Sequence, residues 1–208
     1  LSYLRPNAVD SITGINSKDN TGLGMPQIHF TEWDNDYLSA DLMLKGGGCE
    51  NVSLQLSLPD TAINAGRDLD GVRRAVIEGV FRAQGKGCAP GIIGVCVGGD
   101  RATSMTAAKE QLFRKLYDKN SNPVLKSLEE RLYKECNELG IGPMGFGGKT
   151  TVLGVKICTL HRLPASFFVS IAYMCWACRR MSVEMRNDGI SFSEDCITAR
   201  SEFLERLF

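Results

Sequence analysis

The glycine-bounded segment from Gly85 to Arg101 constrains the fold more than any other part of the chain. It reads Gly-Lys-Gly-Cys-Ala-Pro-Gly, then the apolar run 92–97, and then a second glycine pair. A short apolar run bounded by glycines predicts a buried strand. Glycines on both sides leave Cys88 uncovered at the mouth of that strand, and Pro90 stiffens the turn. Two interpretations stay open: a thiolate that binds a metal or cluster, and a small buried apolar side chain.

The remaining sequence contains both strand-like and helix-like patterns. Alternating apolar and polar residues predict strands, whereas apolar residues at helical spacing predict helices. Residues 1–27 predict an ordered loop because Gly, Pro, Asn, Asp and Ser dominate them. We expect strands at 28–30, 38–44, 52–58, 92–97, 151–157, 167–174 and 181–185, the first two joined as a hairpin, and helices at 68–84, 104–117, 123–139 and 198–207. These elements predict an α+β fold, with mainly antiparallel or mixed sheets packed with about four helices.

Charge and composition exclude several classes of partner. The 208 residues carry 24 basic and 24 acidic side chains, so the net charge gives no sign of nucleic-acid or anionic-membrane binding. No apolar run reaches membrane-spanning length. Eight cysteines lie scattered along the chain. A chain of this size can build a core without a disulfide framework, so we expect reduced thiols and a cytoplasmic location. The first residue is not Met, and we expect a fragment or a processed chain.

Three further motifs leave their chemistry open. The run Lys45–Asn51 contains three consecutive glycines, which form either an anion-binding nest or a wide turn. The run Gly140–Thr151 resembles a phosphate-binding P-loop, but the glycine that the motif needs falls on Pro143. The β-branched segment that follows predicts a strand and not the required helix, so we reject a P-loop.

The pair Cys175 and Cys178 has the spacing of half a zinc site. No second pair completes such a site, and a strand precedes this pair where a thioredoxin-like site needs a helix start. The pair is therefore accidental, or one of its sulfurs binds a ligand together with a distant cysteine. Arg5 precedes a proline and is extended, as suits an arginine that forks onto a carboxylate or a solvated surface arginine. His29 and His161 are expected to be structural.

Three stretches taken together carry a resemblance to a known family. They are Leu4–Val9, Lys45–Asn51, and Gly87–Pro90 with its following strand, and two further runs extend the match, Leu139–Lys149 and Cys175–Arg180. The chain resembles the N-terminal domain, or separate α subunit, of class I (iron–sulfur) fumarate hydratases. The α subunits of L(+)-tartrate dehydratase share this layout. The resemblance covers nearly all of the chain and implies the α+β fold of that domain.

The resemblance also implies a set of site residues. In the family, three cysteines hold a [4Fe–4S] cluster whose fourth iron is open to substrate. By position, Cys88 and Cys175 resemble two of these ligands. The third belongs to a Cys-Gln-Asp-Thr-Gly motif upstream of the Arg5 segment, and this sequence does not contain it. Arg5 resembles the arginine that binds a substrate carboxylate, and Gly48 resembles the glycine whose backbone lies against the substrate.

Other positions depart from the family pattern. Cys49 stands where some relatives carry serine, so we do not expect it to be a cluster ligand. Leu163 aligns with a substrate-facing histidine of some fumarases, and the nearby His161 is a weak substitute. The catalytic acid–base groups are unknown. No carboxylate pair or convincing general base is visible, so the resemblance implies that they lie on a second domain or subunit.

The resemblance implies a hydro-lyase domain that reversibly hydrates fumarate to L-malate, a reaction of the tricarboxylic acid cycle. Tartrate dehydratase, or another small 2-hydroxy diacid dehydratase, is an alternative of the same class. A non-catalytic iron–sulfur or redox-sensing domain that uses Cys88, Cys175 and Cys178 is an alternative of another class. We expect residues 1–208 to be one α-domain that is inactive alone. Its expected partners are a small dicarboxylate, a C-terminal domain or β subunit, and a second copy in a homo-oligomer such as a dimer.

Overall fold

The computed structural model describes residues 5–193, and these fall into two compact units divided between Asp36 and Tyr37. In the first unit, the described residues form turns and isolated bridges, such as the bridge from Val9 to Asn16. The backbone N–H of Thr13 donates to Asp10 Oδ1 at 2.7 Å and lowers the pKa of that carboxyl. These contacts confirm the ordered loop expected for this region. The helix expected at 198–207 lies outside the described residues.

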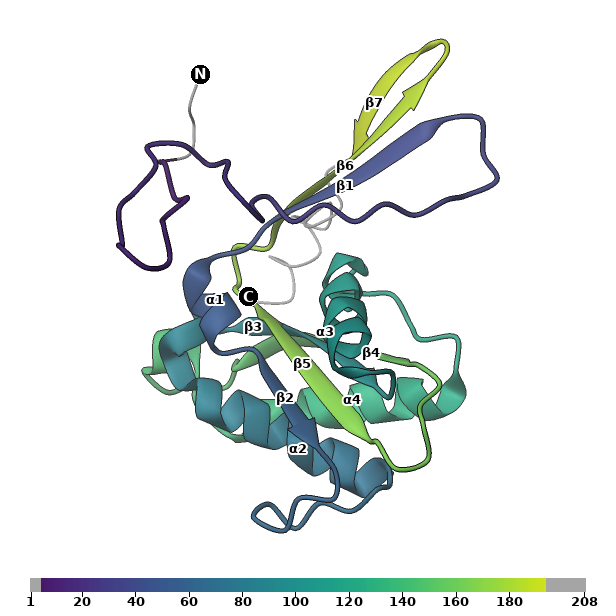
Figure 1. The fold of residues 1–208 in the computed structure, drawn as a ribbon. Helices are drawn as coiled ribbons and strands as arrows, with labels where there is room; N and C mark the ends of the chain where they lie inside the picture. The colour runs from purple at the N-terminus through teal and green to yellow at the C-terminus, as the bar shows by residue number, and fades with distance from the viewer. Residues whose placement is uncertain (1–4, 194–208) are drawn as a thin grey trace. The chain divides into compact units, whose positions relative to one another are not determined.

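A four-stranded mixed sheet forms the centre of the second unit (Figure 1). Its strands, in spatial order, are β2 (Leu54–Ser57), β5 (Phe168–Met174), β3 (Gly91–Val97) and β4 (Val152–Thr159). β3 runs parallel to β4, while β5 runs antiparallel to both β2 and β3. β3 and β5 are buried along almost their whole length because helices cover both faces of the sheet, as expected for continuous apolar runs.

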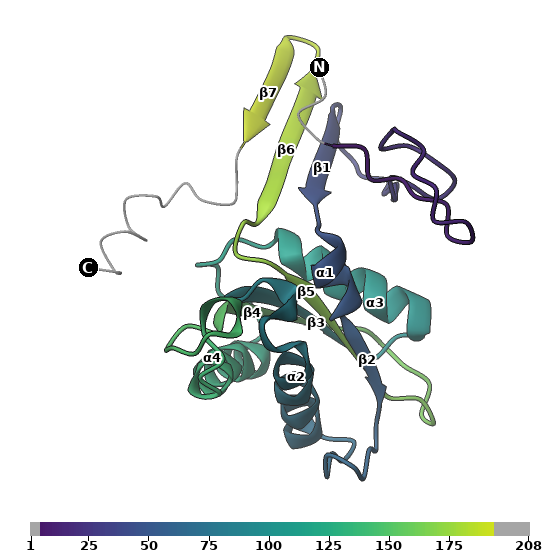
Figure 2. The ribbon, with the colours of Figure 1, turned by 90° about the vertical axis from the view of Figure 1, so that its left-hand side faces the viewer.

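Three long helices cover the central sheet. Helices α2 (Leu69–Ala83) and α4 (Pro123–Glu138) pack on one face, and α3 (Arg101–Glu110) packs on the other (Figure 2). Each helix begins at a side-chain cap. These caps are Asp68, Asp100 and Asn122, whose side-chain oxygens accept N–H groups of the first turns. The α+β fold with four helices, counting the short α1 described below, is therefore confirmed for the described residues.

Helix α3 ends earlier than the expected helix 104–117. It runs from Arg101 to Glu110, and a 3-10 turn from Gln111 to Phe113 follows it. Arg114 then takes an extended conformation. Its guanidinium binds the carboxylates of Asp118 at 2.9 Å and Glu129 at 2.7 Å. These two ion pairs draw the chain away from the helix axis, an effect that helical periodicity alone could not predict.

A separate antiparallel sheet consists of β1 (Leu38–Leu44), β6 (Arg179–Arg186) and β7 (Gly189–Ser193), in the order β1-β6-β7. The hairpin expected between residues 28–30 and 38–44 is therefore wrong, because β1 pairs with β6 and residues 28–30 form no strand. Pairing with β6 gives seven residues in register, which a three-residue segment cannot offer. The register also aligns apolar side chains across the sheet, as in the row Leu38, Met185 and Ile190.

The three-glycine run forms the start of a helix instead of a wide turn or an open nest. Gly46 is the N-cap of the five-residue helix α1 (Gly47–Asn51). Glu50 of this helix binds Lys45 and, from α3, Lys109, each at 2.6 Å. Burial raises the pKa of Glu50, but the hydrogen bonds from the two lysines outweigh it and lower that pKa overall. The ion pair with Lys109 ties α1 to α3 within the second unit.

Candidate functional site

Cys88 lies on the turn that leads into β3, as the sequence predicts. The 3-10 turn Gln84–Gly87 ends at Cys88, whose backbone is left-handed with φ 57° and ψ 59°. Its N–H donates to the carbonyl of Gly85 at 3.1 Å. Few residues other than glycine adopt this conformation, so the turn holds the cysteine in a costly backbone state. The side chain is only partly buried. Such backbone strain is typical of residues at functional sites, where the direction of the side chain matters more than local stability.

Cys175 follows the last residue of β5. Because β5 and β3 are antiparallel and Met174 pairs with Ile92, the end of β5 lies beside the start of β3. Cys175 and Cys88 therefore flank the same edge of the central sheet. The N–H of Cys178 donates to the carbonyl of Cys175 at 3.1 Å, which closes a tight turn before β6. The two cysteines therefore lie at the ends of neighbouring strands, although 87 residues separate them in the sequence.

Cys49 brings a third sulfur to this edge. It is the one buried residue of α1, and its thiol donates to the carbonyl of Gly87 at 3.2 Å. Burial, and then the neighbouring Cys175, raise the pKa of Cys49 to about 11, so this sulfur stays protonated at neutral pH. The resemblance points to the neighbouring Gly48, but the contact between Cys49 and Gly87 depends on the unexpected helix α1.

Tyr173 lies beneath the three thiols. Its ring packs against Gly87 and Gly91, and a Cβ on Gly87 would come within 2.5 Å of the ring. Its hydroxyl is buried and has no hydrogen-bond partner among the described residues. Burial, followed by the nearby thiols, raises the pKa of this phenol. A buried polar atom without a partner is costly, and one that lies among cysteines marks a place where a polar ligand can bind. Strand alternation alone does not reveal this role.

Gly48 lies close to the Cys88 turn. A Cβ at Gly48 would stand 3.1 Å from the carbonyl oxygen of Lys86, so the backbones of α1 and the turn approach each other closely. The glycine loop at 140–148 supports the same turn from another side: the N–H of Met144 donates to the carbonyl of Ala89 at 2.9 Å. The strand β4 follows this loop, which confirms the rejection of a P-loop.

Three further positions were singled out from the sequence: Arg5, His161 and Leu163. Arg5 belongs to the first unit and is exposed, and its role stays a prediction. His161 and Leu163 occupy the loop between β4 and β5, at the sheet edge opposite the one that carries Cys88. There the carbonyl of His161 accepts the N–H of Gly99 at 3.2 Å. Among the described residues, His161 thus lies at the end of the sheet opposite the Cys88 turn, and the role of its side chain stays a prediction.

The residue types at this sheet edge suit an iron–sulfur cluster, but the described residues supply too few ligands to hold one. Thiolates are the ligands that such clusters prefer, and Cys88 and Cys175 leave room for a ligand at a glycine-rich edge. The orphaned hydroxyl of Tyr173 adds a hydrogen-bond donor. Within residues 5–193, however, no three His, Cys, Asp or Glu side chains are grouped so that they could hold a metal ion. The described residues thus supply part of a ligand set.

Known proteins share this sequence over most of its length. The family described as fumarate hydratase (Fumerase) matches residues 1–184. A putative class I fumarate hydratase of Geobacillus stearothermophilus is 55% identical over 185 residues, which cover 88% of this chain and 36% of that protein. A putative L(+)-tartrate dehydratase subunit alpha of Methanocaldococcus jannaschii is 35% identical over 189 residues, covering 89% and 64%.

The L(+)-tartrate dehydratase subunit alpha of Escherichia coli K12 is 30% identical over 191 residues, which cover 89% of this chain and 60% of that subunit. The chain thus spans between about a third and two thirds of the relatives that it matches. In the part of the chain that the structure describes, no helix has the length and apolar character to cross a membrane. From the match over residues 1–184, the chain belongs to the fumarate hydratase (Fumerase) family.

Proposed function

We propose that this chain is the cluster-binding domain of a hydro-lyase that reversibly hydrates fumarate to L-malate. The observation that carries the proposal is the placement of Cys88 and Cys175 at one edge of the central sheet, in a chain of the fumarate hydratase family. Dehydration of L(+)-tartrate is the second candidate, because two α subunits named for that reaction align with most of this chain.

In this proposal, Cys88 and Cys175 hold a [4Fe–4S] cluster together with a third thiolate from elsewhere in the whole protein. A bound cluster would supply a Lewis acid for the loss of the hydroxyl of a 2-hydroxy diacid as water. The backbone of Gly48, close to the Cys88 turn, would lie against the substrate. Arg5 would bind a substrate carboxylate with its planar guanidinium. The buried hydroxyl of Tyr173, which has no partner among the described residues, would be free to donate a hydrogen bond to the bound group.

The proposed partners follow from the same assignment. The acid–base groups belong to a C-terminal domain or a β subunit, because the sequence contains no carboxylate pair and no convincing general base. Residues 1–208 form one such α-domain, and the whole enzyme is a homo-oligomer. A cytoplasmic, reducing compartment suits cysteines that must stay available as thiolates.

A chimera tests the proposal directly. The residues of the Geobacillus protein that match this chain are replaced by those of this chain, which are 55% identical. The chimera is reconstituted anaerobically with iron and sulfide, and its loss of fumarate is followed by ultraviolet absorbance. We expect hydration of fumarate, together with the broad visible absorption of a cluster. Cys88→Ser and Cys175→Ser should each abolish both signals.

Cys136→Ser is the matched control, because Cys136 is a lone buried thiol of α4. It should keep both the cluster and the activity. Equal activity of the Cys88→Ser chimera and its parent would overturn the assignment. A chimera that holds the cluster but converts no diacid would favour the redox-sensing alternative. Assays with fumarate and L(+)-tartrate side by side distinguish the two hydro-lyase candidates.

The substrate arginine requires a separate test. In the active chimera, Arg5→Lys should raise KM or lower kcat because an ammonium cannot make the planar two-point contact with a carboxylate. Unchanged kinetics would remove Arg5 from the site.

The 208-residue chain by itself should show no turnover after reconstitution, since it lacks the third ligand motif and the acid–base groups. Removal of an acid–base group alone typically lowers a rate by about 10² to 10⁴.

A further inference from the structure

Two cysteines outside the proposed cluster site lie side by side in the central sheet. Cys96 of β3 and Cys158 of the parallel strand β4 are paired residues in the ladder. Neighbouring strands are about 4.8 Å apart, which lies inside the range of Cα separations that a disulfide spans, about 4.4 to 6.8 Å. The backbone therefore already holds the two residues at a distance that one S–S bond can bridge.

The two side chains also lie on the same face of the sheet. Cys96 belongs to the apolar cluster beneath α3, and Cys158 packs against that cluster. The thiol of Cys158 is 3.8 Å from the carbonyl oxygen of Ala107 in α3. The ladder pairing and the shared apolar cluster therefore place the two side chains next to each other on one face of the sheet.

Polar groups behind Cys96 favour its thiolate. The neighbouring side chain of Cys158 lowers the pKa of Cys96, burial opposes this shift, and the side chain of Ser104 supports it. The neighbouring Cys96 in turn raises the pKa of Cys158. The Ser104 hydroxyl accepts from Ser170 Oγ at 2.7 Å, and Ser170 in turn accepts from Gln55 at 2.8 Å. Ser104 is thus fixed by a buried chain of hydrogen bonds.

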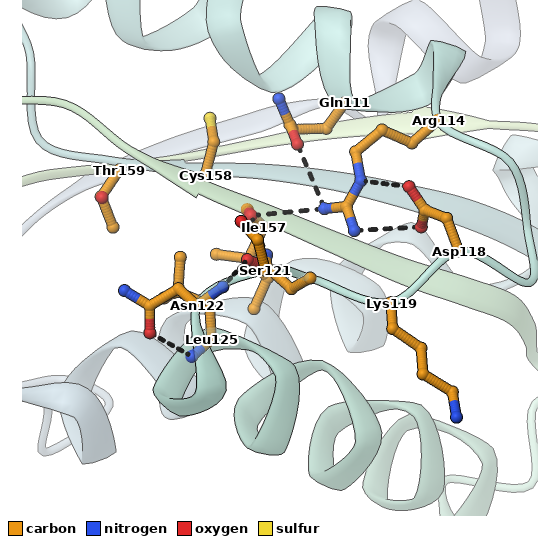
Figure 3. A pocket seen from close by; sticks show the side chains of 11 residues that line it. Gln111, Arg114, Asp118, Lys119, Ser121, Asn122, Leu125, Ile157, Cys158 and Thr159 are labelled. Atoms are coloured by element: carbon orange, nitrogen blue, oxygen red, sulfur yellow. Dashed lines mark hydrogen bonds and ion pairs between the residues drawn. The ribbon is translucent and has the colours of Figure 1, made fainter.

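An open pocket of about 430 Å³ gives access to the pair from the solvent. Cys158 lies on its wall, between Ile157 and Thr159 of β4, and its sulfur points toward the side of the pocket that carries Gln111 (Figure 3). Arg114 on the same wall is neutralised by Asp118 and Glu129. A small uncharged oxidant can therefore reach Cys158, whereas Cys96 behind it is fully buried.

We propose that Cys96 and Cys158 are a redox-active dithiol that a hydroperoxide, entering through this pocket, converts to an intrachain disulfide. Loss of the Cys158 proton to solvent in the pocket leaves a thiolate on Cys158. That thiolate attacks the peroxide, an S–O bond forms, the O–O bond breaks, and the departing oxygen takes a proton from solvent to become water or an alcohol. Cys96 then attacks the sulfenic sulfur of Cys158 as a thiolate, and its thiol proton passes to the hydroxide that leaves. The S–S bond forms, the S–O bond breaks, and that hydroxide becomes water.

The experiment is thiol mapping of the purified 208-residue chain after exposure to hydrogen peroxide. Free thiols are alkylated, and the peptides are analysed by mass spectrometry with and without reduction. We expect a peptide that joins Cys96 to Cys158, lighter by two hydrogen atoms than the two reduced peptides together. Reduction with dithiothreitol should return both thiols. In Cys96→Ser, Cys158 should stop at the sulfenic acid and be trapped by dimedone.

Cys136→Ser serves as the control and should form the same disulfide at the same rate. Alkylation of both Cys96 and Cys158 after peroxide has oxidised other thiols of the wild-type chain would overturn the proposal. So would a disulfide from Cys158 to any other cysteine. Because the wild-type chain gives the deciding result, poor folding of a variant leaves the test intact. The outcome is independent of whether Cys88 and Cys175 bind a cluster.

Discussion

The two ends of strand β3 carry cysteines in contrasting surroundings. At its start, Cys88 lies on a left-handed glycine turn, and Cys175 reaches the same edge from the end of β5. Near its other end, Cys96 lies within the regular ladder, opposite Cys158. Turns can direct sulfur atoms toward an external ligand, whereas a ladder directs them toward each other. The same residue type therefore suits ligation at one end of the strand and disulfide formation at the other.

Substitution of a glycine that packs against Tyr173 is expected to change stability more than any other variant in this comparison of the two ends of β3. In Gly91→Ala, the new Cβ would overlap the buried ring of Tyr173. Overpacking of this kind costs about 1 to 3 kcal/mol of unfolding free energy, and the clash should disturb the start of β3 most. Urea denaturation measures the loss. Alkylation of Cys88 should speed up, while the Cys96–Cys158 disulfide should still form.

Gly47→Ala is the matched control for that substitution. A Cβ at Gly47 meets no atom within 4 Å, and the residue lies in the first turn of α1. Alanine there should be neutral or should stabilise by up to about 1 kcal/mol. Equal destabilisation by Gly47→Ala and Gly91→Ala would show that packing against Tyr173 does not set the geometry of this edge.

The sequence predicts the cysteine at the start of β3 well and the pair near its end not at all. Glycine, proline and cysteine mark the Cys88 turn locally, so both the turn and the following strand can be read directly from residues 85–97. The pairing of Cys96 with Cys158 depends on the register between two strands that lie 55 residues apart in sequence at the closest, from Val97 to Val152. No local pattern encodes that register.

The errors of the sequence-based expectations have the same origin. The strand at 38–44 is marked by its own alternation, but its partner β6 lies more than 130 residues away, so a nearby hairpin was the wrong choice. The sequence pattern does not predict helix α1 because glycine is a poor helix former. It forms here because Cys49 is buried against Gly87 and Glu50 binds two lysines. Tertiary contacts therefore decide both cases.

A third kind of cysteine provides a reference for the comparison. Cys136 is fully buried in α4, and burial raises its pKa from 9.0 to about 12. Between pH 9 and about 12 the unfolded chain loses this proton while the folded chain keeps it, so stability should fall as pH rises. Cys136→Ala should reduce that slope by up to about 1.4 kcal/mol per pH unit. Urea denaturation at several alkaline pH values measures it, and identical slopes would contradict the expectation.

The orphaned hydroxyl of Tyr173 predicts a smaller effect at the ligand-binding edge. Without a cluster, this buried group has no hydrogen-bond partner among residues 5–193. Tyr173→Phe should therefore stabilise the cluster-free chain by about 1 kcal/mol, measured by urea denaturation. Tyr133→Phe, at an exposed position of α4, should leave stability unchanged. A loss of stability in Tyr173→Phe would mean that the hydroxyl already has a structural role.

The smallest expected effect concerns Ser104, a neighbour of Cys96 that lowers the pKa of that thiol. Ser104→Ala removes the hydroxyl that favours the Cys96 thiolate, while Ser170 keeps its hydrogen bond from Gln55. Attack on the sulfenic sulfur of Cys158 requires that thiolate, so disulfide formation should slow by a few-fold. The rate is measured by quenching peroxide reactions with acid at intervals and mapping the peptide that joins the two cysteines.

Ser57→Ala is the control for this last variant, because Ser57 is exposed and its hydroxyl binds only Arg101 among the contacts described for it. It should leave the rate unchanged. Both variants should also leave alkylation of Cys88 unchanged, since Ser104 lies at the opposite end of β3 from the Cys88 turn. If Ser104→Ala changed the rate of disulfide formation and the rate of Cys88 alkylation to the same extent, the two ends of the strand would be coupled. The contrast between a ligand-binding edge and a self-contained dithiol would then have to be abandoned.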